Sequence, residues 1–329
     1  MKAIVPVAGA GTKLRPHTYT QPKALIPVAG KPILQYIIEQ LIDAGVKDYV
    51  FVIGYLGEKI KDFVEKTFPD LNATFVEQES REGIGHAIFL TKDLIKKNEE
   101  LLIVLGDSVF DLDLKEVISN PHSVLGVKKV EDPRDFGVAE NDADDFITRV
   151  VEKPLIPKSN LALVGLYKIK ESEALFTAIN YLIENNIQTK EEFQLTDALM
   201  YMIDEGIRFK SYKVNQWFDC GKKEALLETN ATLLKKQLQQ PVAVFENTII
   251  IPPVNFGLHC KITNSIIGPH VTIGEHAHIH GCILRNSIIG SYSDLNDVVL
   301  NESIIGNDAN VRGKSNSLNI GDNAELDLR

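Results

Sequence analysis

Two hydrophobic periods alternate over the first third of the chain. Runs of apolar residues that fit buried strands cover residues 2–7, 48–53, 73–77 and 101–105. Between them, apolar residues recur every three to four positions, which predicts helices over residues 31–45, 58–68 and 85–97. Strands that alternate with helices are typical of an α/β fold with a mostly parallel sheet. Ligands gather at the carboxyl ends of strands in such sheets, so we expect a site in the loops after Val7, Glu77 and Leu105.

The same two periods continue to a boundary near Gln240–Pro241. Helices are predicted over residues 192–206 and 224–239, with a strand over residues 209–214 between them. Residues 1–240 are therefore expected to form one α/β domain.

Beyond Pro241 the apolar residues follow a different period. Asn-Ser-Ile-Ile-Gly occurs at 264–268 and 286–290, Glu-Ser-Ile-Ile-Gly at 302–306, and Asn-Ile-Gly at 319–321. Ile267, Ile273 and Ile279 are spaced six residues apart. One apolar residue in every six fits a solenoid with short strands on three faces and each Ile pointing inward. Residues 244–329 are therefore predicted to form a hexapeptide-repeat β-helix of about four to five coils.

Composition and charge exclude several classes of protein. The 329 residues suffice for two domains, and 44% of them are hydrophobic. The net charge of −10 and the absence of a basic run make a nucleic-acid partner unexpected. No apolar run is long enough to predict a membrane span. Three scattered cysteines indicate neither a disulfide framework nor a zinc site, so a cytoplasmic location is expected.

A glycine-rich segment, Gly9–Pro16, follows the first predicted strand. Glycines let backbone N–H groups approach a phosphate closely. The segment is not a P-loop, because Gly-Lys-Ser/Thr is missing, and Leu14 stands where a dinucleotide fingerprint needs its third glycine. Lys23 follows about ten residues later and could reach the same phosphates. Taken singly, these residues also fit an ordinary turn and a solvated lysine.

The segment Gly9–Pro32, GAGTKLRPHTYTQPKALIPVAGKP, resembles the signature of nucleotidyltransferases that make nucleotide sugars. Later blocks resemble those of the same family in the same order: QESREGIGHA at 78–87, Gly106-Asp107, Phe136-Gly137-Val138, Glu152-Lys153-Pro154, Gly165-Leu166-Tyr167, Gln194-Leu195-Thr196-Asp197 and Trp217-Phe218-Asp219-Cys220-Gly221. Long members of the family carry a C-terminal left-handed β-helix. The resemblance thus implies a Rossmann-like catalytic domain followed by such a β-helix.

The resemblance also implies a reaction and its residues. A sugar-1-phosphate would attack the α-phosphate of a nucleoside triphosphate and release pyrophosphate. Asp107 and Asp219 would hold Mg²⁺, because two carboxylates from separate elements suit an ion that also takes phosphate oxygens. The implied catalytic residues are Lys13, Lys23, Asp107 and Asp219. The implied nucleotide-binding residues are Ala8, Gly9, Gly11, Thr12, Gln78 and Gly83. The implied sugar-phosphate residues are Gly137, Glu152, Lys153 and Gly165.

Gln78 and the GIGHA run favour a pyrimidine, so dTTP or UTP with glucose-1-phosphate is the expected substrate pair. A guanylyltransferase acting on mannose-1-phosphate is the alternative within the family. Lys13 departs from the family, which usually has Arg there, and a lysine holds phosphate only as a point charge. Arg15 could compensate. The departure keeps open a catalytically silent regulatory or scaffold subunit.

Four histidines lie close together in the repeat region: His270, His276, His278 and His280. They could serve as the base of an acyltransferase or gather a metal ion. We favour the simpler interpretation, in which they occupy outward positions of the solenoid. Because solenoid ends and faces commonly associate, a homo-oligomer is expected.

Overall fold

The computed structural model describes residues 1–237 and 244–313, which form two compact units. The first unit contains Met1–Pro27 and Lys31–Leu226. The second contains Val28–Gly30 and the described residues from Leu227 onward. The predicted boundary at Gln240–Pro241 and the Asn-Ile-Gly at 319–321 lie outside the described residues.

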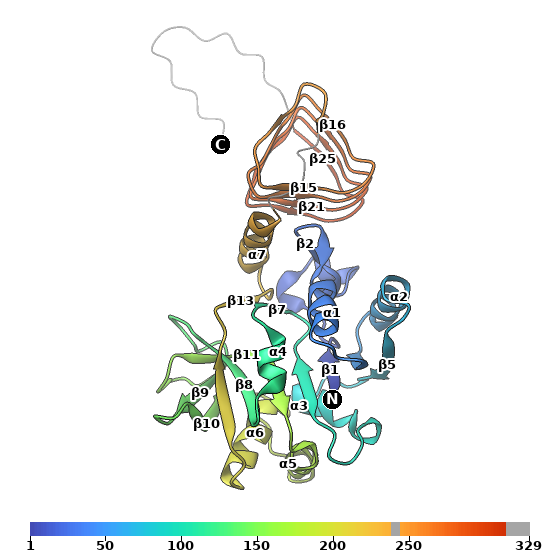
Figure 1. Ribbon diagram of the computed structural model, residues 1–329. Coiled ribbons are helices and arrows are strands. Elements are labelled where there is room, and N and C mark those ends of the chain that lie inside the picture. The colour runs from blue at the N-terminus through green and yellow to red at the C-terminus, as the bar shows by residue number, and fades with distance from the viewer. Residues whose placement is uncertain (238–243, 314–329) are drawn as a thin grey trace. The chain divides into compact units, whose positions relative to one another are not determined.

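A nine-stranded sheet forms the centre of the first unit, in the order β5-β4-β1-β6-β11-β8-β12-β10-β9 (Figure 1). Four neighbouring strands are parallel: β5 (Asn72–Glu77), β4 (Asp48–Ile53), β1 (Lys2–Pro6) and β6 (Leu101–Val104). The other five are β8 (Ser123–Lys129), β9 (Gly137–Asn141), β10 (Phe146–Glu152), β11 (Leu161–Ile169) and β12 (Phe209–Lys213).

The prediction of a mostly parallel sheet holds only for the first four strands. β11 runs antiparallel to both β6 and β8, and β10 runs antiparallel to both β9 and β12. Only β8 and β12 are parallel in the second half. The sheet is therefore mixed, because β11 returns antiparallel between β6 and β8 instead of crossing over in the parallel sense.

Seven α-helices accompany the described strands: α1 (Ile33–Asp43), α2 (Gly57–Thr67), α3 (Ile84–Phe89), α4 (Leu114–Ser119), α5 (Ser172–Glu184), α6 (Leu195–Asp204) and α7 (Lys223–Lys236). None of them is long and apolar enough to cross a membrane. Two further strands, β7 (Ser108–Asp111) and β13 (Gln216–Asp219), pair antiparallel outside the main sheet. Two-residue strands β2 (Pro27–Val28) and β3 (Lys31–Pro32) precede α1, so the helix predicted from residue 31 begins two residues later.

The helix predicted over residues 85–97 was too long. α3 ends at Phe89, and only a short 3-10 turn over Lys92–Leu94 follows. Thr91 is fully buried, and both its backbone N–H and its hydroxyl donate to the carbonyl of Ile88. A threonine that binds the backbone three residues earlier competes with helix continuation.

The order in which strands are added to the parallel half of the sheet reverses between β1 and β6. From β1 the chain first builds β4 and β5 on one side and then places β6 on the other side. The loops that follow two strands at such a point diverge and leave a crevice between them. The glycine-rich loop after β1 and the Gly106-Asp107 loop after β6 are therefore brought together.

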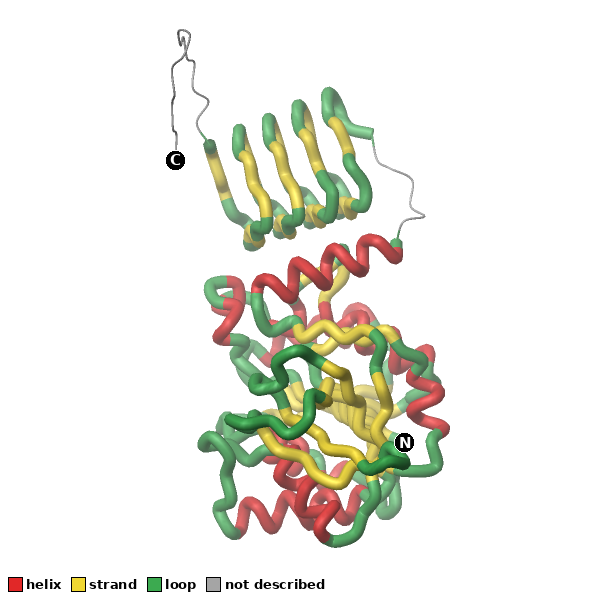
Figure 2. Tube along the Cα trace, turned by 90° about the vertical axis from the view of Figure 1, so that its left-hand side faces the viewer, coloured by secondary structure: helices red, strands yellow, loops and turns green. Residues whose placement is uncertain are grey.

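The second unit contains three four-stranded parallel sheets that form the three faces of a β-helix (Figure 2). The first is β14 (Ile249–Ile250), β17 (Ile266–Ile267), β20 (Ile283–Arg285) and β23 (Val299–Asn301). The second is β15 (Val254–Phe256), β18 (Val271–Ile273), β21 (Ile288–Ile289) and β24 (Ile304–Ile305). The third is β16 (Lys261–Thr263), β19 (His278–His280), β22 (Asp294–Asn296) and β25 (Asn310–Arg312).

The six-residue period is confirmed as the period of the solenoid. Ile267, Ile273 and Ile279 each lie on a different face and are at most 2% exposed. The four strands of each face give four coils in the described part of the chain. This arrangement is consistent with the left-handed β-helix that the resemblance implied.

Asn230 of α7 connects that helix to the coils within the second unit. Its side chain is fully buried, and its Oδ1 accepts from the backbone N–H of Ala29 at 2.8 Å and from Thr272 Oγ1 at 2.6 Å. Its Nδ2 donates to the carbonyl of His270 at 3.2 Å. A buried amide that makes three hydrogen bonds favours one packing arrangement.

The clustered histidines occupy the surface of the solenoid, as predicted. His278 and His280 flank the buried Ile279 on β19 and are exposed. His270 and His276 stand at corners between strands with positive φ, and the ring of His276 stacks on Tyr292 at 4.9 Å. No group of three or more metal-ligating side chains suited to an ion occurs among the described residues.

Candidate active site

Two adjoining cavities open at the carboxyl ends of β1 and β6. The first cavity has a volume of about 410 Å³ and the second about 500 Å³. They share the glycine-rich loop together with Lys23 and Asp107. The first extends toward Gln78 and Gly83, and the second toward β9, β11 and β13.

The structure brings every predicted site residue to one of these cavities. The first cavity is lined by Ala8, Gly9, Gly11, Thr12, Lys23, Gln78, Gly83 and Asp107. The second is lined by Gly9, Gly11, Thr12, Lys13, Lys23, Asp107, Gly137, Glu152, Lys153, Gly165 and Asp219. Segments that are up to two hundred residues apart in sequence thus share one cleft.

The glycine-rich loop is packed against the segment that carries Lys23. Gly11 has φ +61°, a conformation that residues with a Cβ rarely adopt. A Cβ there would lie 2.8 Å from Thr18 Cγ2 and 3.0 Å from Lys23 Cβ. Thr18 Oγ1 donates to the carbonyl of Gly11 at 2.8 Å. Gly11 is therefore required both for the turn and for the close approach of Lys23.

Lys23, Asp107 and Asp219 form a charged cluster, in which Lys23 and Asp107 line both cavities and Asp219 lines the second. Lys23 Nζ lies 2.5 Å from Asp107 Oδ2. The antiparallel pairing of β13 with β7 sets Asp219 opposite Ser108, and the N–H of Cys220 donates to the carbonyl of Asp107 at 3.1 Å. Asp219 therefore enters the site through backbone pairing of two strands that are about a hundred residues apart.

The cluster shifts the ionisation of its members. Burial by itself lowers the pKa of Lys23, but the negative charges of Asp107 and Asp219 raise it above its ordinary value. Burial, and then the charge of Asp107, raises the pKa of Asp219. Lys23 thus remains a cation, while the two carboxylates oppose each other and would be relieved by a further positive charge.

Glu152 is held from two sides in the second cavity. Its Oε1 lies 3.1 Å from Lys153 Nζ, and its Oε2 accepts from Thr196 Oγ1 at 3.0 Å. The Glu152 side chain is only 9% exposed, whereas that of Lys153 is 39% exposed. The carboxylate is therefore fixed in place, and the ammonium group can reach a ligand.

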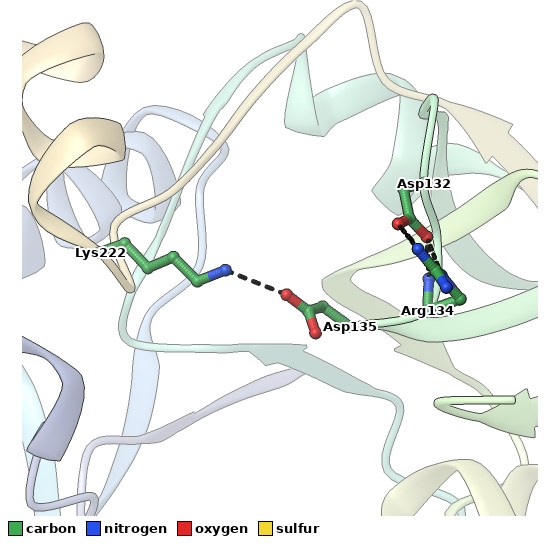
Figure 3. Close-up of polar contacts among 4 residues, drawn as sticks. All are labelled: Asp132, Arg134, Asp135 and Lys222. Atoms are coloured by element: carbon green, nitrogen blue, oxygen red, sulfur yellow. Dashed lines mark hydrogen bonds and ion pairs between the residues drawn. The ribbon is translucent and has the colours of Figure 1, made fainter. Parts of the chain in front are cut away.

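An ion pair crosses the rim of the second cavity. Lys222 Nζ lies 3.0 Å from Asp135 Oδ2 (Figure 3). Asp135 lines the cavity, and so does Gly221, the residue before Lys222. The hydrogen bond from Lys222 lowers the pKa of Asp135. Both side chains are exposed, so this pair links two loops without contributing much stability.

Lys13 and Arg15 lie in different surroundings. Lys13 is exposed and lines the second cavity. Arg15 lines neither cavity, and its guanidinium lies 5.0 Å from the centre of the Tyr19 ring. The suggested compensation by Arg15 is therefore not supported. Arg81, which the sequence analysis did not single out, brings a guanidinium side chain to the first cavity.

Sequence reasoning also missed Glu192, Thr196 and Asp135 as site residues. Glu192 lines both cavities because the N–H of Phe193 donates to the carbonyl of Glu82 and the N–H of Gly85 donates to the carbonyl of Phe193, both at 2.8 Å. The same pairing leaves no room at Gly83, where a Cβ would lie 2.6 Å from the Phe193 oxygen. Because Phe193 makes this pairing, the helix predicted from residue 192 begins only at Leu195, the first residue of α6. Thr196 lies within the block at 194–197, whereas Glu192 and Asp135 lie just before the blocks at 194–197 and 136–138, so no motif marked them.

A family model described as nucleotidyl transferase matches residues 2–236, which span both cavities. The chain belongs to the nucleotidyl transferase family. Its relatives are sugar-1-phosphate nucleotidyltransferases, so this nucleotidyl transferase is an enzyme of that class.

Similar proteins match different shares of this nucleotidyl transferase. The low-salt glycan biosynthesis nucleotidyltransferase Agl11 of Haloferax volcanii is 28% identical over the whole of both chains. A glucose-1-phosphate thymidylyltransferase of Streptomyces antibioticus is 30% identical, with 91% of this chain and 89% of the relative covered. The bifunctional protein GlmU of Methanocaldococcus jannaschii is 37% identical over 76% of this chain, which spans only 59% of that relative. A UDP-glucose pyrophosphorylase complexed with UDP-glucose is 28% identical, with a TM-score of 0.63 over 71% of this chain and 98% of that structure.

Enzymes of the nucleotidyl transferase family generally use a divalent metal ion. Asp107 and Asp219 are chemically suited to one, because they are two carboxylates, and burial followed by the charge of Asp107 raises the pKa of Asp219. No third metal-ligating side chain joins them among the described residues. An ion held there would therefore complete its coordination with substrate oxygens and water, as Mg²⁺ commonly does.

Proposed function

We propose that the enzyme transfers a nucleotidyl group from dTTP or UTP to glucose-1-phosphate and releases pyrophosphate. The observation that carries the proposal is the pair of cavities that share Lys23 and Asp107, with Asp219 in the second. One cavity offers glycine-rich backbone and Gln78, which suit a nucleotide. The other offers Glu152 and Lys153, which suit a sugar phosphate.

In this reaction an oxygen of the sugar-1-phosphate attacks the α-phosphorus of the triphosphate. The bond from that phosphorus to the oxygen bridging the β-phosphate breaks, and pyrophosphate leaves. The attacking oxygen is already ionised, so no side chain has to remove a proton. The task of the protein is to hold two polyanions together and to offset the charge that shifts toward pyrophosphate.

The residues of the cleft divide this task. Backbone N–H groups of the loop from Ala8 to Thr12 bind the triphosphate, and Lys13 attracts its pyrophosphate end. Lys23 remains charged, so it offsets the charge between the two reacting phosphates. Asp107 and Asp219 would hold Mg²⁺, which supplies Lewis-acid polarisation of phosphate oxygens.

The remaining residues bind the two substrates away from the reacting atoms. Gln78 and Gly83 receive the base in the first cavity. Lys153 binds the sugar phosphate, and Glu152 accepts hydrogen bonds from sugar hydroxyls. Gly137 and Gly165 leave room for the sugar beside them.

The relatives support a pyrimidine and glucose. One relative is named for thymidylyl transfer to glucose-1-phosphate, and one similar structure contains UDP-glucose. Both dTTP and UTP therefore belong to the proposal. The alternative is a guanylyltransferase that acts on mannose-1-phosphate, and the experiment must distinguish it from the proposed reaction.

The test is pyrophosphate release with Mg²⁺ across dTTP, UTP, GTP and ATP, each combined with a panel of sugar-1-phosphates. We expect release with dTTP or UTP and glucose-1-phosphate well above every other pair. Highest activity with GTP and mannose-1-phosphate would replace the proposed substrates. Folded protein that shows no activity with any pair would indicate a regulatory subunit and would point to Lys13 as the cause.

We further propose that residues 1–240 form the catalytic domain and residues 244–329 a β-helix domain through which a cytoplasmic homo-oligomer assembles. The support is the separate compact unit that contains the coils. Light scattering on the full chain would test assembly, and a monomer at all concentrations would contradict it.

A further inference from the structure

Gln78 lies at the wall of the first cavity, directly after β5. Its backbone N–H donates to the carbonyl of Ile53 at 2.8 Å, which continues the sheet pairing for one more residue. The residue is 7% exposed and lines the cavity. Its side chain is therefore positioned by the sheet rather than by a mobile loop.

Two neighbours determine which way the Gln78 amide points. Its Nε2 lies 3.1 Å from the carbonyl oxygen of Gly83 and 3.2 Å from His86 Nδ1. A carbonyl oxygen can only accept, so the group that faces Gly83 must be the NH₂ group. His86 then accepts the second N–H through an unprotonated Nδ1, with its own proton on Nε2.

The same contacts leave the other end of the amide available. Both N–H groups of Gln78 are used, while its Oε1 has no hydrogen-bond partner within the described part of the chain. Gly83 itself is held, because its carbonyl accepts from the N–H of Ala87 at 3.1 Å and its neighbours Glu82 and Gly85 pair with Phe193. The acceptors that orient Gln78 are thus fixed by the backbone and by α3.

We propose that His86 determines base specificity by locking the Gln78 amide with its carbonyl oxygen presented to the base. An acceptor at that place selects a base that offers a ring N–H, as N3 of uracil and thymine does. It rejects cytosine, whose N3 is an acceptor. The inference rests on the proposed function, and His86 acts as a positioning residue because it contacts Gln78 and does not line the cavity.

UTP and CTP give the sharpest test, because they have the same size and opposite hydrogen-bonding patterns at N3 and C4. The measurement is the ratio of kcat/KM for UTP to that for CTP, with saturating sugar-1-phosphate. His86→Leu removes one of the two acceptors that hold the NH₂ group, so the Gln78 amide is less firmly oriented. We expect the ratio to fall about tenfold, a typical value for one hydrogen bond.

His86→Asn is the matched control, since its Oδ1 can take the place of the imidazole Nδ1. It should keep the ratio within about twofold of wild type, and neither variant should change the KM for the sugar-1-phosphate. A loss of fold would lower all activities together and would not change the ratio. A folded His86→Leu variant with an unchanged ratio would overturn the role of His86 and leave the proposed function standing.

Activity measurements on the wild-type protein distinguish the remaining outcomes. Preference for CTP over UTP would show that Gln78 does not present its carbonyl oxygen to the base. The proposed nucleotidyl transfer would still stand. No turnover with any triphosphate would instead overturn the proposed function. In that case, or if His86→Leu does not fold, the ¹⁵N NMR signals of the His86 ring test the inference. The inference requires the Nε2–H tautomer of His86. Finding the Nδ1–H tautomer would overturn it.

Discussion

The two cavities of the cleft are built by different means. The first depends mainly on backbone: the glycine-rich loop after β1, and Gly83 pinned beside the Phe193 carbonyl. The second depends on side chains from distant segments, such as Thr196 on Glu152 and Lys222 on Asp135. A backbone cradle accepts any phosphate chain, whereas placed side chains distinguish one sugar phosphate from another. The comparison teaches that we should expect the phosphate chain to be held mainly by backbone, and the sugar phosphate by side chains that distant segments place.

The largest effect is expected at Asp107, which lines both cavities, and at Asp219 in the second, because both carboxylates are suited to the metal ion. Asp107→Asn and Asp219→Asn should each lower kcat by about a thousandfold or more, since each removes a carboxylate suited to the metal ion. The measurement is pyrophosphate release at saturating substrates with Mg²⁺. Near-wild-type rates in either variant would show that the metal assignment is wrong.

Asp219→Asn should also stabilise the protein at neutral pH. Because the pKa of Asp219 is raised in the folded state, the folded protein binds a proton there more tightly than the unfolded chain. The ionised carboxylate therefore costs stability, and the cost is lost as the pH falls toward the ordinary value of 3.8. Thermal melts should show a higher Tm for Asp219→Asn at pH 7 and no advantage below that value. A lower Tm at pH 7 would contradict the assigned environment.

A substitution confined to the second cavity should affect one substrate only. Lys153→Met removes the cation that can reach the sugar phosphate, so the KM for the sugar-1-phosphate should rise about 10–100-fold. The KM for the triphosphate should stay within about twofold, because Lys153 does not line the first cavity. Equal increases in both KM values would show that the two halves of the cleft are not separate.

A smaller effect is expected at Thr196, which orients Glu152. Thr196→Val keeps the shape but removes the hydroxyl that donates to Glu152 Oε2, so the KM for the sugar-1-phosphate should rise about three- to tenfold. Thr196→Ser restores the hydroxyl and should recover most of the loss. If serine and valine behave alike, the hydrogen bond does not position Glu152.

The smallest effect is expected at Lys13. Lys13→Arg should keep kcat/KM within about threefold of wild type or raise it, because arginine can bind phosphate with two parallel hydrogen bonds. Steady-state kinetics with the preferred substrate pair would measure this. A large loss would show that Lys13 does not occupy the place of the family arginine.

The two units also differ in how far sequence could predict them. In the β-helix, the positions of Ile267, Ile273 and Ile279 determined strands, faces and buried residues, because every coil repeats the same local environment. In the α/β unit, β1, β4, β5, β6 and β12 and the loops after β1 and β6 were predicted, since their hydrophobic runs and glycines act locally, whereas β8, β9, β10 and β11 were not. The mixed second half of the sheet was not, because the direction of β11 depends on strands far away in the chain.

The amino-acid sequence by itself determined the repeat, the strand–helix alternation and which motifs belong to the cleft. Tertiary structure alone decided that α3 ends at Phe89, that Glu192 reaches both cavities and that Thr196 holds Glu152. It also decided which two groups the Nε2 of Gln78 contacts. The physical reason is the range of the interactions: periodicity and turn chemistry act over a few residues. Hydrogen bonds between side chains form only after the fold has brought distant segments within about 3 Å of each other.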